Sequence, residues 1–264
     1  MNKKIWLAAV SFAVVCAMAL AGIGIKNNMR NSKLKAQFAQ AEQSQAGGNL
    51  IEARDAYKGL MQQNFDVEKA KEVYSKIEKL NIDILFSPVK TEDSVIYKVQ
   101  PGDTLDAIAK KYGTTVQLIK RANNLTSSMI KPGAELKVNT AKFSIVVDKS
   151  QNILTLKANE QAIKTYNVAT GTNNCTPVGT FKIATKIIDP PWYSSGRIIP
   201  PDDPKNILGS RWMGFTIKSY GIHGTTDDSS IGTQQTQGCV RMHNSDVEEL
   251  YDIIPVGAEV TILD

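Results

Sequence analysis

The sequence GIHGTTDDSSIGTQQTQGCVRMHNSD, residues 221–246, determines how the rest of the chain is interpreted. It contains His223, one of two histidines, and Cys239, one of three cysteines. A thiol attacks as the thiolate, so it needs a base or a positive charge within hydrogen-bonding reach. His223 can supply the base, and Arg241 with the following helix N-terminus can supply positive potential. Gly238 allows a sharp turn that presents backbone N–H groups to an oxyanion. A cysteine and a histidine at this separation also occur by chance, so the pair alone is weak evidence.

The complete pattern is more specific. It consists of H-G-T at 223–225, I-G at 231–232 and T-x-G-C-V-R-M at 236–242, followed by a predicted helix. Two upstream stretches accompany it, ATGTNNCTPVGTFKI (169–183) and DPPWYSSGRIIPPDDPKNILGSRWMGF (189–215). Together these motifs closely resemble, in order, those of the L,D-transpeptidases, the YkuD-like enzymes of the bacterial cell wall. The resemblance implies a mostly-β catalytic domain over residues 142–264.

The resemblance also implies a mechanism. Cys239 would attack the carbonyl of the third residue of a peptidoglycan stem tetrapeptide and form a thioester. His223 would take the thiol proton, or stabilise an existing thiolate, and then protonate the departing D-Ala amine. An amine of a second stem would then give a 3→3 cross-link, water would make the enzyme an L,D-carboxypeptidase, and a protein lysine would tether that protein to the wall. The sequence leaves this acceptor open, and no cofactor or metal is expected. The oxyanion and supporting residues implied beside the Cys239 N–H are Gly238, Gln237, Thr236, Gly224 and Arg241.

Three positions need separate interpretation. The family commonly has Ser-His-Gly-Cys where this chain has Thr-Gln-Gly-Cys at 236–239, so Gln237 removes a titratable group but can still donate a hydrogen bond. Cys175 is a second departure; it could oxidise with Cys239 to a disulfide, or be a lone small side chain. His243 lacks the further Cys or His ligands that a zinc site needs, so we expect a surface or helix-capping role.

Composition and charge limit the other classes of function. The 264 residues allow more than one domain, and 42% hydrophobic with 22% charged residues is ordinary for a globular protein. The net charge of +5 is mild and not clustered, so nucleic acid is not expected as a partner. A rival interpretation from another class is a non-catalytic wall-binding protein; the retained cysteine and histidine motif argues against it.

The N-terminus is predicted to contact a membrane. Residues 5–25, IWLAAVSFAVVCAMALAGIGI, form an uncharged run long enough to cross a bilayer as one helix. We therefore expect residues 1–30 to be a membrane anchor, with a signal peptide cleaved near Ala19-Leu20-Ala21 as the alternative. Either interpretation is consistent with a protein of the bacterial cell envelope, outside the cytoplasm.

Residues 31–87 are predicted to be helical. They are rich in Ala, Gln, Glu and Lys, with Gly47-Gly48-Asn49 between two helical patterns and a third helix over 67–80. The segment resembles one tetratricopeptide-type (TPR-like) helix pair. The alternative is a helical stalk that lifts the later domains off the membrane.

Residues 97–138, YKVQPGDTLDAIAKKYGTTVQLIKRANNLTSSMIKPGAELKV, closely resemble a LysM module, which we place at 95–139. The pattern predicts strand, helix, helix and strand, with Asp103 or Thr104 capping the first helix and Thr115 starting the second. The resemblance implies binding of a peptidoglycan strand containing N-acetylglucosamine. The groove residues it implies are Gly102, Asp103, Thr104, Leu105, Asn124 and Ile130.

The last domain is predicted to consist mainly of β-strands. Alternating runs predict strands at 143–148, 153–158, 162–170, 179–185 and 257–263. Ser245-x-x-Glu248 predicts a capping box at the start of a helix between Cys239 and the last strand. Residues 189–206 contain five prolines and predict a surface loop, with Trp192 or Tyr193 over the site. The sequence therefore predicts a multi-domain protein: an N-terminal transmembrane helix, a helical segment, an α+β LysM module and a mostly-β catalytic domain.

Overall fold

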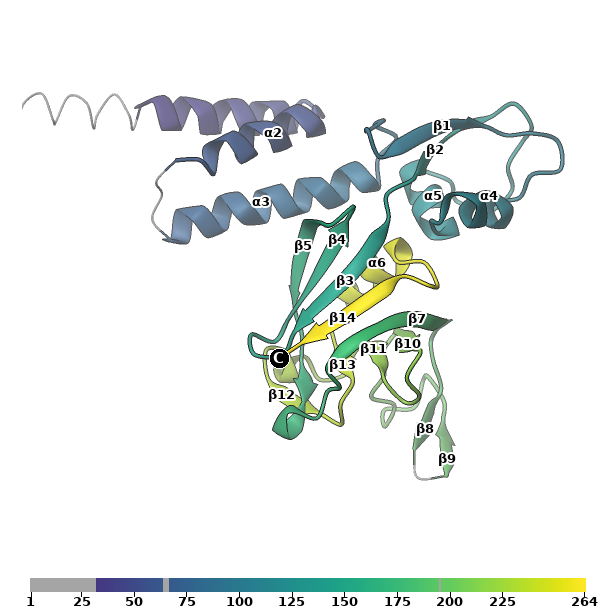
Figure 1. Cartoon of the computed structure of the whole chain (residues 1–264). Helices are drawn as coiled ribbons and strands as arrows, with labels where there is room; N and C mark the ends of the chain where they lie inside the picture. Colours follow the sequence, from purple (N-terminus) through teal and green to yellow (C-terminus); the bar gives the residue numbers. More distant parts are fainter. Residues whose placement is uncertain (1–31, 64–66, 195) are drawn as a thin grey trace, which may run out of the picture. The chain divides into compact units, whose positions relative to one another are not determined.

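The computed structural model describes residues 32–63, 67–194 and 196–264 (Figure 1). The chain divides into two compact units at Leu80/Asn81. The apolar run at 5–25, and with it the predicted anchor, lies outside the described residues. Among the helices that the structure describes, none is both long and apolar enough to cross a membrane.

The first unit is helical. A helix over residues 32–46 is followed by α2 (Leu50–Leu60) and α3 (Val67–Leu85), which continues into the second unit. Gly48 lies at the turn between the first two helices with φ +78°, a conformation that suits glycine. The helices share a core of their own, so the segment buries apolar surface within itself. That core consists of Ala41, Ala53, Tyr57, Leu60, Val73, Ile77 and Leu80.

The second unit begins with the predicted LysM module, which has the βααβ order expected for it. Its elements are β1 (Ser94–Lys98), α4 (Leu105–Tyr112), α5 (Val116–Ala122) and β2 (Glu135–Asn139), with β1 antiparallel to β2. Thr104 Oγ1 accepts a hydrogen bond from the Ala107 N–H at 3.1 Å, and Thr115 Oγ1 accepts one from the Leu118 N–H at 2.9 Å. Of the two residues predicted to cap the first helix, Thr104 is therefore the N-cap, and Thr115 is the N-cap of the second helix, which it is predicted to start.

The predicted catalytic domain is organised around an eight-stranded sheet of order β13-β11-β10-β7-β14-β3-β4-β5. Neighbouring strands are antiparallel except β14 with β3 and β11 with β13. The alternating runs of the sequence correspond to the longer strands. The bounds are β3 Phe143–Asp148, β4 Ile153–Ala158, β5 Gln161–Asn167, β7 Gly179–Ile188, β10 Arg211–Phe215, β11 Gly221–His223, β13 Val240–Arg241 and β14 Glu259–Leu263.

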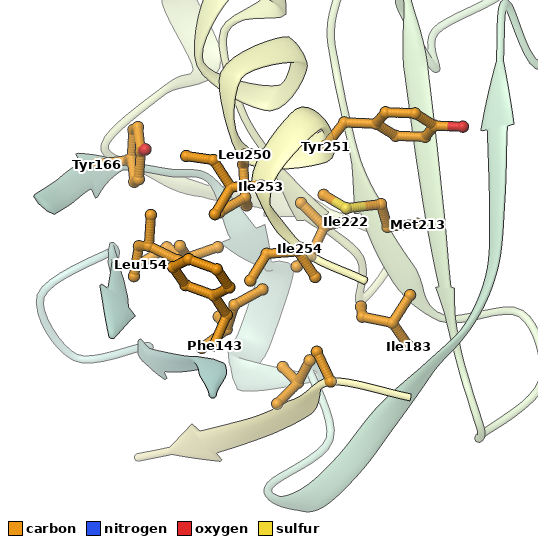
Figure 2. Packing of buried hydrophobic residues seen from close by; sticks show 14 of the residues in the cluster. Phe143, Leu154, Tyr166, Ile183, Met213, Ile222, Leu250, Tyr251, Ile253 and Ile254 are labelled. Carbon is orange, nitrogen blue, oxygen red and sulfur yellow. The ribbon is translucent and has the colours of Figure 1, made fainter. Parts of the chain in front are cut away.

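Helix α6 (Asn244–Ile253) packs its apolar face on this sheet. Val247 and Leu250 are fully buried, and Figure 2 shows Leu250 and Ile253 beside strand residues such as Leu154 and Ile222. The i, i+3 spacing of the buried positions places them on one face of the helix. The chain enters this helix directly after Cys239 and β13, so packing of α6 fixes the segment that carries the thiol.

Two sequence predictions for this domain are wrong. The capping box at Ser245 is absent, because the N-cap is His243 and no side chain caps this helix end. The predicted loop at 189–206 contains a small antiparallel hairpin, β8 (Trp192–Ser194) with β9 (Arg197–Ile199), drawn apart from the main sheet in Figure 1. Its strands are three residues each, too short for an alternation pattern to reveal them.

The LysM module and the catalytic domain share packing within the second unit. Leu118 of α5 is fully buried and belongs to the hydrophobic cluster of the catalytic domain. Thr115 donates its hydroxyl to the Asp252 carbonyl, and Arg121 lies 3.0 Å from the Asp252 carboxylate at the end of α6. Arg121 also covers the ring of Phe86. Helix α5 therefore contacts both the LysM core and α6.

Candidate active site

Two neighbouring strands bring the predicted nucleophile and base together. β11 and β13 are parallel, with Ile222 opposite Val240 and His223 opposite Arg241. Cys239 precedes β13 and so lies beside Gly221. Side chains of a strand alternate between faces, so Cys239 and Arg241 project from the same face as His223. The pairing thus joins both ends of the 221–246 stretch.

This face opens into a cavity of about 590 Å³. Of the predicted catalytic and supporting residues, Cys239, His223, Thr236, Gln237 and Arg241 line it. Trp192 and Tyr193 of β8 form part of its wall, as expected for the proline-rich segment. The other lining residues are Ile187, Pro190, Pro191, Ile207, Leu208, Trp212, Ser219, Tyr220 and Gln235.

His223 is held as a neutral imidazole. Its Nδ1 lies 2.7 Å from the Gly224 carbonyl, which can only accept, so Nδ1 carries the proton and Nε2 is the unprotonated nitrogen of the neutral ring. Burial lowers the pKa of His223 to about 4, and the positive charge of Arg241 lowers it further. Hydrogen bonds to the carbonyls of Gly224 and Leu208 act in the opposite direction but are outweighed. Trp212 stacks on the ring with centroids 6.0 Å apart. A buried neutral imidazole is in the correct state to act as a base.

Cys239 is held as a thiol. Its Sγ lies 3.6 Å from the Ser219 carbonyl, to which it donates. Burial raises the pKa of the Cys239 thiol. A hydrogen bond from the Gly221 N–H and the positive charge of Arg241 lower this pKa, but the effect of burial is larger. The expected help from a helix N-terminus is small, because α6 begins five residues later at Asn244. The resting pair is thus a thiol with a neutral imidazole, so proton transfer has to accompany attack.

The turn before the thiol differs in detail from the expectation. Gly238 has φ +115°, and a Cβ there would lie 2.6 Å from the Tyr220 ring, so only glycine fits. The Gly238 N–H already donates to Thr236 Oγ1 at 3.1 Å, and that hydroxyl donates to the Cys239 carbonyl at 2.7 Å. Gly238 therefore provides the backbone conformation of the turn, and its N–H is not available to bind an oxyanion. Within the described chain, the N–H groups of Cys239 and Gln237 carry no hydrogen bond.

Asn244 is a site-supporting residue that the sequence did not indicate. Its Oδ1 accepts from the N–H groups of Ser210 and Thr225, each at 3.1 Å, and its Nδ2 donates to the Thr225 carbonyl at 2.8 Å. A Cβ on Gly224 would lie only 2.1 Å from Asn244 Oδ1. Gly224 therefore has two roles, as the acceptor for His223 and as the residue that lets Asn244 approach. A lone asparagine in a helical pattern gives no signal of such contacts.

The remaining polar residues separate into two groups. Arg241 Nη1 donates to Ser230 Oγ at 3.0 Å, and its buried Nε has no partner within the described residues. Arg241 thus borders the cavity with unused hydrogen-bonding capacity. His243 is elsewhere: it is the N-cap residue of α6, and its Nδ1 lies 2.7 Å from the Asp228 carboxylate. It is not among the residues that line the cavity.

In the LysM module, the predicted groove residues have mixed environments. The Asp103 carboxylate accepts from the Tyr97 hydroxyl at 2.8 Å and from the Gln100 N–H at 2.7 Å, which fixes the turn containing Gly102. Leu105 is only 1% exposed and belongs to the module's core, so its side chain cannot contact a glycan. Ile130 is partly buried against the same core, and Asn124 has φ +53°.

Comparisons with known proteins match both domains. Residues 142–262 match the YkuD family, described as the L,D-transpeptidase catalytic domain, and residues 97–139 match the LysM domain. YkuD of Bacillus licheniformis, named as an L,D-transpeptidase, is 33% identical over 176 residues, covering 64% of this chain and 98% of that protein. YqjB of Bacillus subtilis, also named as an L,D-transpeptidase, is 40% identical over 126 residues, which cover 46% of this chain and 70% of that protein. A solved L,D-transpeptidase from Mycobacterium tuberculosis H37Rv aligns with 16% identity and a TM-score of 0.41, covering 51% of this chain and 64% of that one.

The chain therefore belongs to the L,D-transpeptidase family, with a LysM domain ahead of a YkuD-type catalytic domain. It is a transpeptidase of the cell wall, with peptidoglycan as the substrate consistent with both domains.

Proposed function

We propose that the protein is a cysteine-dependent L,D-transpeptidase that acts on peptidoglycan stem tetrapeptides. Cys239 attacks the carbonyl of the third stem residue, His223 Nε2 takes the thiol proton, and the same histidine protonates the departing D-Ala amine. The observation that carries this proposal is the pairing of β11 with β13, which puts a thiol and a neutral imidazole on one face of a single cavity.

The oxyanion of the tetrahedral intermediate is assigned to the N–H groups of Cys239 and Gln237. Both are free of other hydrogen bonds in the described chain, whereas the Gly238 N–H is engaged by Thr236. Preorganised backbone donors of this kind stabilise the charge that develops in acyl transfer. Arg241 is assigned to a carboxylate of the stem, because its buried Nε lacks a partner and the residue lines the cavity.

The acceptor is proposed to be an amine of a second stem, which resolves the thioester into a 3→3 cross-link. The apolar wall formed by Trp192, Leu208 and Trp212 favours an amine over water, because it limits solvent around the acyl group. If water reached the thioester, the same residues would act as an L,D-carboxypeptidase, and a lysine acceptor would attach a protein to the wall.

The other segments are proposed to direct the enzyme to its substrate. LysM would bind N-acetylglucosamine-containing glycan between the 102–105 turn and the 124–130 loop. Residues 1–30 would anchor the chain in the membrane, a proposal that rests on the uncharged run at 5–25. Residues 31–87 would separate the anchor from the wall-binding parts, and a TPR-like contact with a partner is the alternative for this segment.

Incubation of the full chain with a purified disaccharide-tetrapeptide, followed by mass spectrometry of the products, tests the proposal. The wild type should release D-Ala and form a cross-linked dimer, and Cys239→Ala should do neither. Cys175→Ser is the matched control, because it removes a thiol that does not line the cavity, and it should retain activity. Release of D-Ala without dimer would assign carboxypeptidase activity, while no turnover with glycan binding intact would favour a binding protein.

A further inference from the structure

A second thiol lies against the turn that carries the nucleophile. Cys175 follows the short 3-10 turn η1 (Thr172–Asn174), and its side chain is exposed. The strand before this turn, β6 (Thr170–Gly171), pairs with β12 (Gln234–Thr236), so Thr236 lies opposite Gly171. Because Cys239 is three residues after Thr236, the sheet pairing brings the two cysteine-bearing loops together.

The contacts at Gly171 give an upper limit for the distance between the Cys175 sulfur and the Cα atom of Gly238. The position of a Cβ on Gly171 would be 2.5 Å from Cys175 Sγ and 3.0 Å from Gly238 Cα, so the sulfur lies at most 5.5 Å from Gly238 Cα. The Cys175 carbonyl is also 3.4 Å from where a Cβ of Gly238 would be. Gly238 immediately precedes Cys239, and the nearby Cys175 adds to the burial that raises the pKa of the Cys239 thiol.

The loop is fixed in place from one side. The Gly171 N–H donates to Thr176 Oγ1 at 2.7 Å, and the buried Lys149 donates to the carbonyls of Thr176 at 2.9 Å and Asn174 at 3.3 Å. The exposed turn between these anchors has Asn173 and Asn174 at φ 52° and 61°. The Cys175 thiol therefore remains next to the catalytic turn, while the exposed side of its loop is open to solvent.

We propose that Cys175 is a resolving thiol, which forms a reversible disulfide with Cys239 when the enzyme meets a peroxide. The consequence for catalysis rests on the proposed role of Cys239 as nucleophile; the formation of the disulfide does not. The bond protects the nucleophile from irreversible oxidation and switches the enzyme off until a reductant is available.

The chemistry balances with a peroxide as the oxidant. His223 takes the Cys239 thiol proton as the sulfur attacks one peroxide oxygen and breaks the O–O bond. That proton passes to the departing hydroxide, which gives a sulfenic acid and one water. The Cys175 thiolate then attacks the sulfenic sulfur, forms the S–S bond and displaces the hydroxyl as a second water. Two thiols lose two electrons in total, and the peroxide gains them. The step requires Cys239 to rotate away from the Ser219 carbonyl.

The test uses the full chain with Cys16→Ser in every variant, so that Cys175 and Cys239 are the two remaining thiols. Each protein is treated with hydrogen peroxide, alkylated, digested without reduction and mapped by mass spectrometry. The expected product is a cross-linked peptide pair joining Cys175 to Cys239, lighter by two hydrogen atoms. Cys175→Ser should instead accumulate Cys239 with two or three added oxygens, because no thiol resolves the sulfenic acid.

Activity on the disaccharide-tetrapeptide provides the second readout. The peroxide-treated parent should lose activity by about tenfold or more and recover it with dithiothreitol, whereas treated Cys175→Ser should not recover. Equal over-oxidation of Cys239 in both proteins, or a disulfide only between two molecules, would overturn the proposal. If the untreated parent were inactive, the proposed function would fail, yet the peptide map would still decide whether the disulfide forms.

Discussion

At the scale of single residues, burial has opposite effects on the pKa values of the two proposed catalytic groups. It lowers the pKa of His223 to about 4 and raises that of Cys239, so both charged forms are disfavoured in the resting site. The sequence indicated the pair but not its protonation, since the sign of a pKa shift depends on packing. The proposed mechanism therefore relies on proton transfer during attack, with the neutral imidazole as base.

The first prediction concerns His223 and acid stability. An unfolded histidine has a pKa near 6.5, so between pH 6.5 and about 4 the unfolded chain binds a proton that the folded chain does not. The free energy of unfolding should thus fall with acidification through this window, by on the order of 3 kcal/mol from this residue. Denaturant unfolding followed by tryptophan fluorescence at pH 7 and pH 4 measures it. His223→Gln should show a smaller pH dependence; an unchanged dependence would refute the assignment.

Gly238→Ala gives the second prediction. The new methyl group would meet the Tyr220 ring in a backbone conformation with φ +115°, which costs about 1–3 kcal/mol and shifts the turn that orients the Cys239 N–H. We expect kcat/KM to fall by roughly tenfold or more. Gly257→Ala is the matched control, because Gly257 also has positive φ, +88°, but no neighbour within 4 Å. An equal fall in kcat/KM in the two variants would show that backbone strain alone, and not the contact with Tyr220, is responsible.

At the scale of elements, periodicity predicted the longer segments and failed for the short ones. Strands β3 and β4 match the predicted 143–148 and 153–158, because alternation over six residues is a clear signal. Strands β11 and β13 are three and two residues long, and only their pairing with neighbours makes them strands. The predicted capping box failed because α6 starts at Asn244, whose side chain bonds to two loops instead of its own helix.

Asn244→Ala is the third prediction. It would remove the acceptor of the Ser210 and Thr225 N–H groups beside the His223–Gly224 segment, at a cost of about 1–3 kcal/mol. Because the segment positions the base, we expect kcat to fall more than KM changes. Ser245→Ala is the control; this exposed neighbour caps nothing, so unfolding and kinetics should stay near those of the wild type. Normal kcat in a folded Asn244→Ala protein would contradict the positioning role.

At the scale of the second unit, from Asn81 to Asp264, the sequence predicted both domains but not their shared packing. The two resemblances place the LysM module and the catalytic domain along the sequence. Contacts between the two domains depend on surfaces that no motif describes. Leu118 illustrates this limit: it lies in the second helix predicted for the LysM module, and the structure places it in the cluster of the catalytic domain. The two modules are therefore expected to unfold together.

Leu118→Ala tests that coupling and is the fourth prediction. Truncation of this fully buried side chain should destabilise the catalytic domain by about 2–5 kcal/mol, detected through Trp192 and Trp212 fluorescence in denaturant. Arg121→Ala, which breaks a half-exposed ion pair at the same contact, should cost about 1 kcal/mol or less. An unchanged unfolding midpoint of the tryptophan signal in Leu118→Ala would indicate independent domains.

The central claim is that Cys239 forms a thioester with the donor stem, and the intact mass of the chain tests it most directly. After brief incubation with disaccharide-tetrapeptide and acid quenching, the protein should gain the mass of the donor less D-Ala. Peptide mapping should place the adduct on Cys239. The adduct should be absent in Cys239→Ala and present in Cys175→Ser. Turnover by Cys239→Ala, or an adduct on any other residue, would contradict the account.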